Sequence, residues 1–239
     1  FIRQNITASA AIAGADITLT CNNRSFIIGS PAQAGDSYSW SPALGLNDST
    51  LADPNVTLPG IYTLTVTNIA NGCTSTDGIT ISKDTMPPKA DAGTDKTLTC
   101  VTKSFIVGSS AITGYSYSWS PAPGLSALNI AQPTATDTGI YRLIVTRISN
   151  GCIATDSVNI DIDTILPIAE AGVDQILPCP HTAVMLGNTS LPNYSYFWTK
   201  QKNLPVTDVA QPLTDSAGTY SLYVINNSNG CKSLPDTVV

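Results

Sequence analysis

The tryptophans of this 239-residue chain recur every 79 residues, at positions 40, 119 and 198. Two sets of cysteines follow the same spacing: Cys21, Cys100 and Cys179, and then Cys73, Cys152 and Cys231. No insertion or deletion interrupts this spacing. The chain therefore reads as three copies of one small domain, with boundaries predicted at 1–82, 83–162 and 163–239. A row of small domains predicts an extended rod.

Both ends of the chain fall at nearly the same point of the repeat. Residues 1–5 align with residues 80–84, and Val239 aligns with Ile160 and Ile81. We therefore expect residues 1–5 to be the tail of a preceding repeat and the last strand of the third repeat to be truncated. On this interpretation the chain is an excerpt from a longer array, with its secretion signal and anchor outside the sequence.

Composition excludes several classes of partner. Charged residues make up 12% of the chain and the formal net charge is −6. Because basic residues form no cluster, the sequence predicts neither a nucleic-acid interface nor a polybasic membrane surface. No apolar run approaches the ~18 residues of a membrane span.

Within each repeat the apolar residues alternate with polar ones, as in half-buried strands. In the second copy this alternation runs through 96–100, 104–108, 115–119, 139–146 and 152–160, between Gly, Pro, Asn and Ser. No segment of ten residues carries a helical stripe. The pattern predicts an all-β fold of three antiparallel sandwiches with about seven strands each.

One motif resembles the D-x-G-x-Y-x-C signature of immunoglobulin domains. It reads Asp137-Thr-Gly-Ile-Tyr141-Arg-Leu143, with a leucine where that family has a cysteine. The resemblance implies that Tyr141 is the tyrosine-corner residue at the start of strand F. It also implies that Trp119 lies on strand C, where we expect it to pack against Leu143 and Ile106.

Longer strings resemble the PKD-like or Ig-like tandem repeats of Bacteroidetes. They are A-D-A-G-x-D-x-x-L-T-C, Y-x-W-S-P-A, G-x-Y-x-L-x-V-T-N-x-x-N-G-C and D-T-x-x-P. Such repeats build large secreted and surface proteins, including gliding-motility adhesins exported by the type IX system. The resemblance implies a cell-surface stalk or filament segment that spaces a distal binding head from the cell. Its partners would be neighbouring repeats, other copies in a filament, and a glycan or protein ligand held by a distal region.

The alternative function is a recognition module whose own loops bind a carbohydrate or a protein. The third repeat diverges most, at residues 197–204, and is where such binding is expected. An enzyme is not expected, because the single histidine, His181, has no counterpart in the other repeats. A Ser/His/Asp or Cys/His centre therefore cannot recur in every repeat, and no single repeat carries a unique catalytic constellation.

Six cysteines without a CxxC pair favour disulfides over zinc, and hence an oxidising compartment. One alternative is a bond within each repeat, such as Cys100 to Cys152. The immunoglobulin strand order argues against it, because it places these two cysteines at opposite ends of the sandwich. We therefore expect bonds between successive repeats: Cys21–Cys152 and Cys100–Cys231. Cys73 and Cys179 would then pair outside this sequence.

Two further kinds of site are expected, the first of them in the proline-containing linkers. Acidic residues recur there and suggest calcium at the joints, although solvated acids explain them as well: Asp84, Asp91, Asp95, Asp163, Glu170 and Asp174. Asp-(Ser/Thr)-apolar triplets resemble the O-glycosylation motif of Bacteroidetes, with chance as the alternative. Their acceptors would be Thr85, Ser157, Thr164 and Ser216. No other cofactor is expected.

Overall fold

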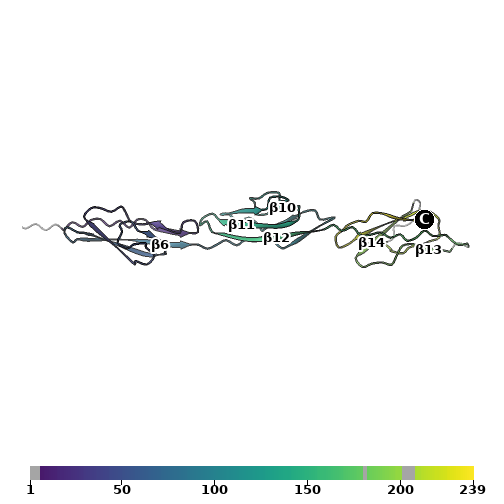
Figure 1. Ribbon diagram of the computed structural model, residues 1–239, viewed down its shortest axis with the longest axis horizontal. Helices are drawn as coiled ribbons and strands as arrows, with labels where there is room; N and C mark the ends of the chain where they lie inside the picture. The colour runs from purple at the N-terminus through teal and green to yellow at the C-terminus, as the bar shows by residue number, and fades with distance from the viewer. Residues whose placement is uncertain (1–5, 180–181, 201–207) are drawn as a thin grey trace, which may run out of the picture. The chain divides into compact units, whose positions relative to one another are not determined.

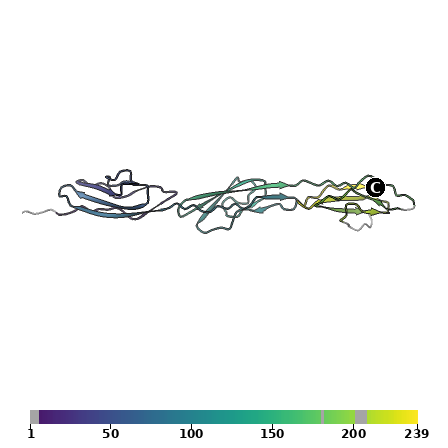
Figure 2. The ribbon, with the colours of Figure 1, turned by 90° about the horizontal axis from the view of Figure 1, so that it is seen from below.

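The computed structural model describes residues 6–179, 182–200 and 208–239, and every regular element in them is a β-strand (Figure 1). The same strands are seen from below in Figure 2. The chain falls into two compact units. One comprises 1–90, 111–118 and 144–155, and the other comprises 91–110, 119–143 and 156–239.

Six strands form the described part of the first repeat: β1 (Ile17–Thr20), β2 (Phe26–Ile27), β3 (Asp36–Ser41), β4 (Asn55–Val56), β5 (Gly60–Asn68) and β6 (Thr74–Asp84). They make a four-stranded sheet in the order β1-β6-β5-β3 and a two-stranded sheet of β2 and β4. Buried and exposed residues alternate along β3 and β5, because successive side chains of a strand point to opposite faces.

The second repeat has the same strand order. It contains β7 (Lys96–Thr99), β8 (Phe105–Ile106), β9 (Tyr115–Ser120), β10 (Thr134–Ala135), β11 (Gly139–Arg147) and β12 (Ile153–Asp163). Its sheets are β7-β12-β11-β9 and β10-β8. The third repeat contains β13 (Val184–Met185), β14 (Tyr194–Lys200), β15 (Leu213–Thr214), β16 (Tyr220–Asn226) and β17 (Asp236–Val238), in sheets β14-β16-β17 and β13-β15.

This order confirms the predicted all-β fold of tandem Ig-like sandwiches and corrects two details. The first two repeats have six strands each rather than about seven. They are also not purely antiparallel, because β1 pairs with β6 in parallel, as β7 does with β12. The first strand of the repeat lies beside the last one at the edge of the sheet, and the two run in the same direction.

The recurring aromatic residues lie in the cores, as predicted. Trp119 is 2% exposed and its Nε1 donates to the carbonyl oxygen of Ile130 at 3.0 Å. Leu143 is buried as well, but the prediction for Ile106 is wrong, because that side chain is 65% exposed. The next residue, Val107, is buried instead. A shift of one residue along a strand exchanges the two faces, so the sequence placed the wrong neighbour inside.

Tyr141 forms the tyrosine corner that the immunoglobulin motif implies. Its hydroxyl lies 3.1 Å from the carbonyl oxygens of both Pro123 and Asp137 and donates to them. Burial, together with the Asp137 carboxylate, raises the pKa of Tyr141 above its usual value of 10.0. The equivalent Tyr62 donates to Leu44 and Leu58 in the same way.

The expectation of an uninterrupted spacing is wrong near the end of the third repeat. There Ile225 is paired with Lys232, whereas Leu222 is paired with Asp236, so the register shifts by one residue between these pairs. Consequently Val238 pairs with Tyr220, although Ile79 pairs with Tyr62 in the first repeat. One extra residue therefore lies in this strand as a β-bulge.

The buried serine of this bulge replaces the ladder contacts that the extra residue disturbs. Ser233 is 5% exposed; its N–H donates to the carbonyl oxygen of Val224, and its Oγ accepts from the N–H of Val224. Because of the shift, Val239 does not align with Ile81 as predicted. The sequence contains the signal: Asp156-Ser-Val158 and Asp236-Thr-Val238 lie 80 residues apart instead of 79.

The last strand of each of the first two repeats runs into the linker. β6 ends at Asp84 and β12 at Asp163, beyond the predicted ends of these repeats at residues 82 and 162. The domain boundaries at 1–82, 83–162 and 163–239 stay a prediction, because each compact unit combines parts of two repeats.

Candidate functional site

The candidate site is a joint between successive repeats, and each of the two compact units contains one. At the first joint the loop that follows β11 meets the turn that follows β1. Cys152 at the end of this loop is disulfide-bonded to Cys21, with 5.0 Å between their Cα atoms. The N–H of Cys21 also donates to the carbonyl oxygen of Asn150 at 3.0 Å. One covalent and one backbone bond therefore link the repeats at the same point.

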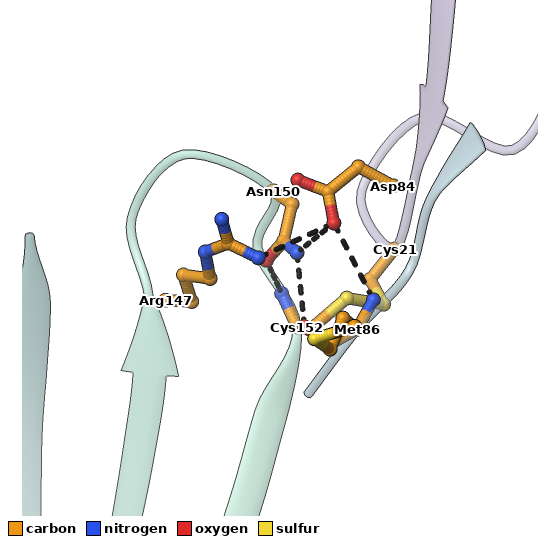
Figure 3. A network of polar contacts seen from close by, with 6 residues as sticks. All are labelled: Cys21, Asp84, Met86, Arg147, Asn150 and Cys152. Atoms are coloured by element: carbon orange, nitrogen blue, oxygen red, sulfur yellow. Dashed lines mark hydrogen bonds and ion pairs between the residues drawn. A yellow bond between two sulfur atoms is a disulfide. The ribbon is translucent and has the colours of Figure 1, made fainter. Parts of the chain in front are cut away.

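The side chain of Asn150 organises the first joint (Figure 3). It is 2% exposed, and its Nδ2 donates to Oδ1 of Asp84 at 2.9 Å and to the carbonyl oxygen of Met86 at 3.0 Å. Its Oδ1 accepts from the N–H of Cys152 at 2.9 Å. Since the amide uses both donor hydrogens and its acceptor, a buried polar side chain is tolerated here.

The second joint repeats this arrangement with different residues. Cys100 is bonded to Cys231, again with 5.0 Å between the Cα atoms, and its N–H donates to the carbonyl oxygen of Asn229. Asn229 donates to Asp163 at 2.9 Å and to the carbonyl oxygen of Ile165 at 3.1 Å. Both cysteine pairs named from the sequence are thus brought together.

The corresponding loop of the first repeat has the same internal contacts. Asn71 accepts from the N–H of Cys73 at 2.9 Å and donates to the carbonyl oxygen of Thr7, the counterpart of Met86. Cys73 and Cys179 carry no disulfide within the part of the chain that the structure describes. Their pairing outside this sequence stays a prediction.

Glycine follows the asparagine in each loop because the backbone there is left-handed. The loop spans residues 147–152, longer than a two-residue hairpin turn, and Gly151 has φ 68°. At the second joint Gly230 has φ 65°, and a Cβ on it would lie 2.6 Å from Cγ1 of Val101 in the preceding repeat. Only glycine combines this conformation with so close an approach.

Electrostatics distinguish the two joints. Nη1 of Arg147 lies 3.3 Å from Oδ1 of Asp84, with both side chains about one third exposed. The hydrogen bond from Asn150, helped by the Met86 N–H and by Arg147, lowers the pKa of Asp84 below its usual 3.8. At the second joint Asn226 stands where Arg147 would be, so this charge is missing there.

The six linker acids do not gather as a calcium site would need. Each instead accepts a hydrogen bond from the protein: Asp84 and Asp163 from the joint asparagines, Asp91 from Gly93, Asp95 from Asn159, Glu170 from Asn188 and Asp174 from Val239. In the described residues no group of three His, Cys, Asp or Glu side chains could hold a metal ion. Calcium at the joints stays a prediction that this geometry does not support.

Three of the four predicted O-glycosylation acceptors are exposed, namely Ser157, Thr164 and Ser216, and Thr85 is half-buried. The aspartates that precede Thr85 and Thr164 hold the joint asparagines, which gives these two triplets a structural reason to recur. Glycosylation itself stays a prediction.

The part of the third repeat expected to bind a ligand is only partly described. Phe197 stacks on Tyr223 with 4.9 Å between ring centroids, and Nζ of Lys232 lies 3.5 Å from the centroid of Tyr223. His181 and residues 201–207 lie outside the described residues.

A cavity of about 380 Å³ in the third repeat lies under the linker and is lined by Tyr194, Tyr196, Glu170 and Asn188, among others. No helix suited to crossing a membrane occurs where the structure describes the chain.

No protein-family model matches the chain, and no curated protein is significantly similar to it in sequence. Solved structures similar to it include tandem immunoglobulin domains. An I-band fragment of titin is 12% identical, with 97% of this chain and 98% of that one covered and a TM-score of 0.42. A fragment with three N-terminal domains of the Hoc protein of bacteriophage RB49 is 12% identical, with 93% of this chain and 94% of that one covered and a TM-score of 0.37.

Sidekick-1 immunoglobulin domains 1–5 are 11% identical, with a TM-score of 0.35. The match covers 96% of this chain but 58% of that one, so the chain spans a little over half of its length. At these identities and TM-scores, no function is transferred from any of these proteins.

Proposed function

We propose that this chain is a load-bearing spacer segment of an extracellular adhesion protein. The observation that carries the proposal is the disulfide at each joint, supported by the same asparagine contacts in both. Tension applied to the chain would be shared between the linker backbone and the disulfide. A joint that only had to orient its neighbours would not need a second covalent connection.

The disulfides also support an extracellular location, because they persist in oxidising compartments and are rare in the cytosol. A stalk or filament segment of a Bacteroidetes-type surface adhesin is the specific form of this proposal. Its partners are neighbouring repeats, other copies in a filament, and a glycan or protein ligand bound by a distal region. The proposal contains no catalytic step.

Single-molecule pulling between residues 1 and 239 tests whether the disulfides carry load. The shortest covalent path then comprises residues 1–21, 100–152 and 231–239, joined by the two disulfides. At ~3.5 Å per residue the oxidised chain should extend to about 280 Å and the reduced chain to about 830 Å. Equal extension in both states would contradict the proposal.

Bonds within the repeats would limit the wild-type chain to nearly the same length, so a variant is needed to separate the two cases. With Cys100→Ser and Cys231→Ser, the joint pairing leaves one disulfide and predicts about 375 Å, whereas pairing within repeats predicts about 650 Å. Cys73 and Cys179 are blocked beforehand so that they form no new bonds.

The second candidate function is ligand recognition by the third repeat. Its cavity combines the tyrosines Tyr194 and Tyr196 with Glu170 and Asn188, residue types that stack on and hydrogen-bond to sugars. A glycan array probed with the whole chain tests this function. Binding that disappears in Tyr194→Ala would favour recognition over spacing, and an array without signal would favour spacing.

A further inference from the structure

We propose that the two disulfides keep the chain covalently continuous after its backbone is cut in either linker. The spans of the two bonds interleave, because one runs from 21 to 152 and the other from 100 to 231. A cut between 22 and 99 leaves fragments that the Cys21–Cys152 bond joins. A cut between 153 and 230 leaves fragments that the Cys100–Cys231 bond joins. After a cut between 100 and 152, both bonds join the fragments.

The linkers are where such protection matters. Residues 85–95 and 164–174 form no strand. Ala92 and Ala171 are buried there, but Met86 is 71% and Ile168 81% exposed. Exposed segments without regular structure are the preferred sites of proteolysis. Disulfides within each repeat would leave both linkers outside the closed loops, so a single cut there would sever the chain.

Noncovalent contacts of the joint also survive a cut in the linker. At the second joint Asn229 binds Asp163 and the carbonyl oxygen of Ile165, which both precede Glu170 in sequence. A cut after Glu170 therefore leaves the donor on one fragment and the acceptors on the other, still side by side. At the first joint, Asp84 and Met86 likewise precede most of the linker in sequence, so a cut later in that linker leaves their contacts with Asn150 in place.

Covalent continuity follows from the disulfides alone, whereas its value to a stalk rests on the proposed function. A surface fibre would tolerate single cuts by proteases at its joints without losing its distal part. The reduced chain would lack this tolerance.

Glu170 makes a direct test feasible, because it is the only glutamate in the sequence and is exposed. The free thiols of the oxidised chain are alkylated, and the chain is then digested in urea with a glutamate-specific protease. The urea concentration is kept low enough for the protease to stay active. We expect one species on non-reducing electrophoresis and two, residues 1–170 and 171–239, after dithiothreitol. Separation of the wild-type fragments without a reductant would overturn the proposal.

Matched variants identify the bond responsible. With Cys100→Ser and Cys231→Ser the fragments should separate without reductant, and with Cys21→Ser and Cys152→Ser they should stay joined. In Lys89→Glu combined with Glu170→Gln, the cut moves to the first linker and the two outcomes should exchange. Any other distribution of outcomes would contradict the interleaved pairing.

Pulling on the cut chain in its native state links the inference to load. Tethered at residues 1 and 239, the oxidised cut chain should hold until dithiothreitol is added, and early rupture would refute the inference. The proposed function fails differently, through equal extension of the uncut chain in its oxidised and reduced states.

Discussion

At the scale of single residues, the joints depend on two buried asparagines. Asn150 and Asn229 each saturate a side-chain amide with groups from two repeats, and each also accepts a backbone hydrogen bond from the partner cysteine. Removing one partner from such a network costs free energy of folding, because the buried atoms that remain lose their hydrogen bonds.

Replacing Asn150 with alanine should therefore weaken the first joint. The substitution leaves the Met86 carbonyl and the Cys152 N–H without their partner, which costs roughly 2–3 kcal/mol. Asn71→Ala is the matched control, because Asn71 is only half-buried, and its loss should be below about 1 kcal/mol. Chemical unfolding measures both, and faster hydrogen exchange at the Cys152 N–H locates the effect. Equal losses would show that the joint contacts contribute nothing.

Acid should weaken the first joint through Asp84. The folded-state pKa of Asp84 lies below its usual 3.8 because Asn150, Met86 and Arg147 favour the ionised form. The ionised Asp84 therefore contributes its full stabilisation above the usual pKa of 3.8. This stabilisation is lost as the pH falls through the lower folded-state pKa. Unfolding midpoints from pH 6 to pH 2 should fall less for Asp84→Asn than for the wild type. The exposed Asp161→Asn serves as control, and parallel curves for all three proteins would contradict the assignment.

At the scale of elements, the asparagine-glycine loops after β11 and β16 are the segments that contact the preceding repeat. An Asn-Gly pair is a turn signal, and the structure has a turn there, closed by residues 147 and 152. The contacts of the asparagine were beyond prediction, because Asp84 and Met86 lie 66 and 64 residues away. Spacing in a sequence gives neither the direction of a side chain nor its distant neighbours.

The glycine of this loop gives a sharp comparison between repeats. Gly230 and Gly72 share a left-handed backbone, so alanine should cost about 1–2 kcal/mol at either position. Only Gly230 also faces Val101, which adds about 1–3 kcal/mol of crowding, whereas a Cβ on Gly72 meets nothing described within 4 Å. Thermal unfolding of Gly230→Ala should show the larger loss, and slower reoxidation of the Cys100–Cys231 bond should accompany it. Losses of the same size would mean that the loop is not packed against its neighbour.

The strands show which buried positions could be predicted from the sequence and which could not. The spacing marked Trp119 and Tyr141 as recurring residues, and the immunoglobulin resemblance correctly placed them in the core. It misplaced Ile106, where the strand is two residues long and the alternation too short to fix the face. The spacing missed the bulge near Ser233, since the cysteines keep their spacing and the extra residue comes after the last of them.

At the scale of the whole molecule, the two bonds make the chain a covalent network rather than a string of independent domains. Each bond joins residues 131 positions apart, and residues 100–152 lie within both spans. The sequence led to this pairing through the immunoglobulin strand order. The acids of the linkers, in contrast, suggested calcium from their recurrence alone, and each of them accepts a hydrogen bond from the protein.

Calcium should therefore leave the stability of the chain unchanged. A cation held at the joints would stabilise the folded state, and more so as its concentration rises, but the acids accept hydrogen bonds from protein donors. Thermal unfolding with excess calcium and with excess EGTA should give the same midpoint. A midpoint that rises with calcium, and that no longer does so in Asp163→Asn, would restore the calcium site.

The central claim is that the disulfides join successive repeats, and a peptide map of the non-reduced chain tests it most directly. Trypsin together with a glutamate-specific protease places the six cysteines on six different peptides, with the bonds kept intact by prior alkylation of free thiols. We expect peptide 4–24 linked to 148–170, and 97–103 linked to 203–232. A map in which 97–103 is linked to 148–170 would show a bond within the second repeat and contradict the account.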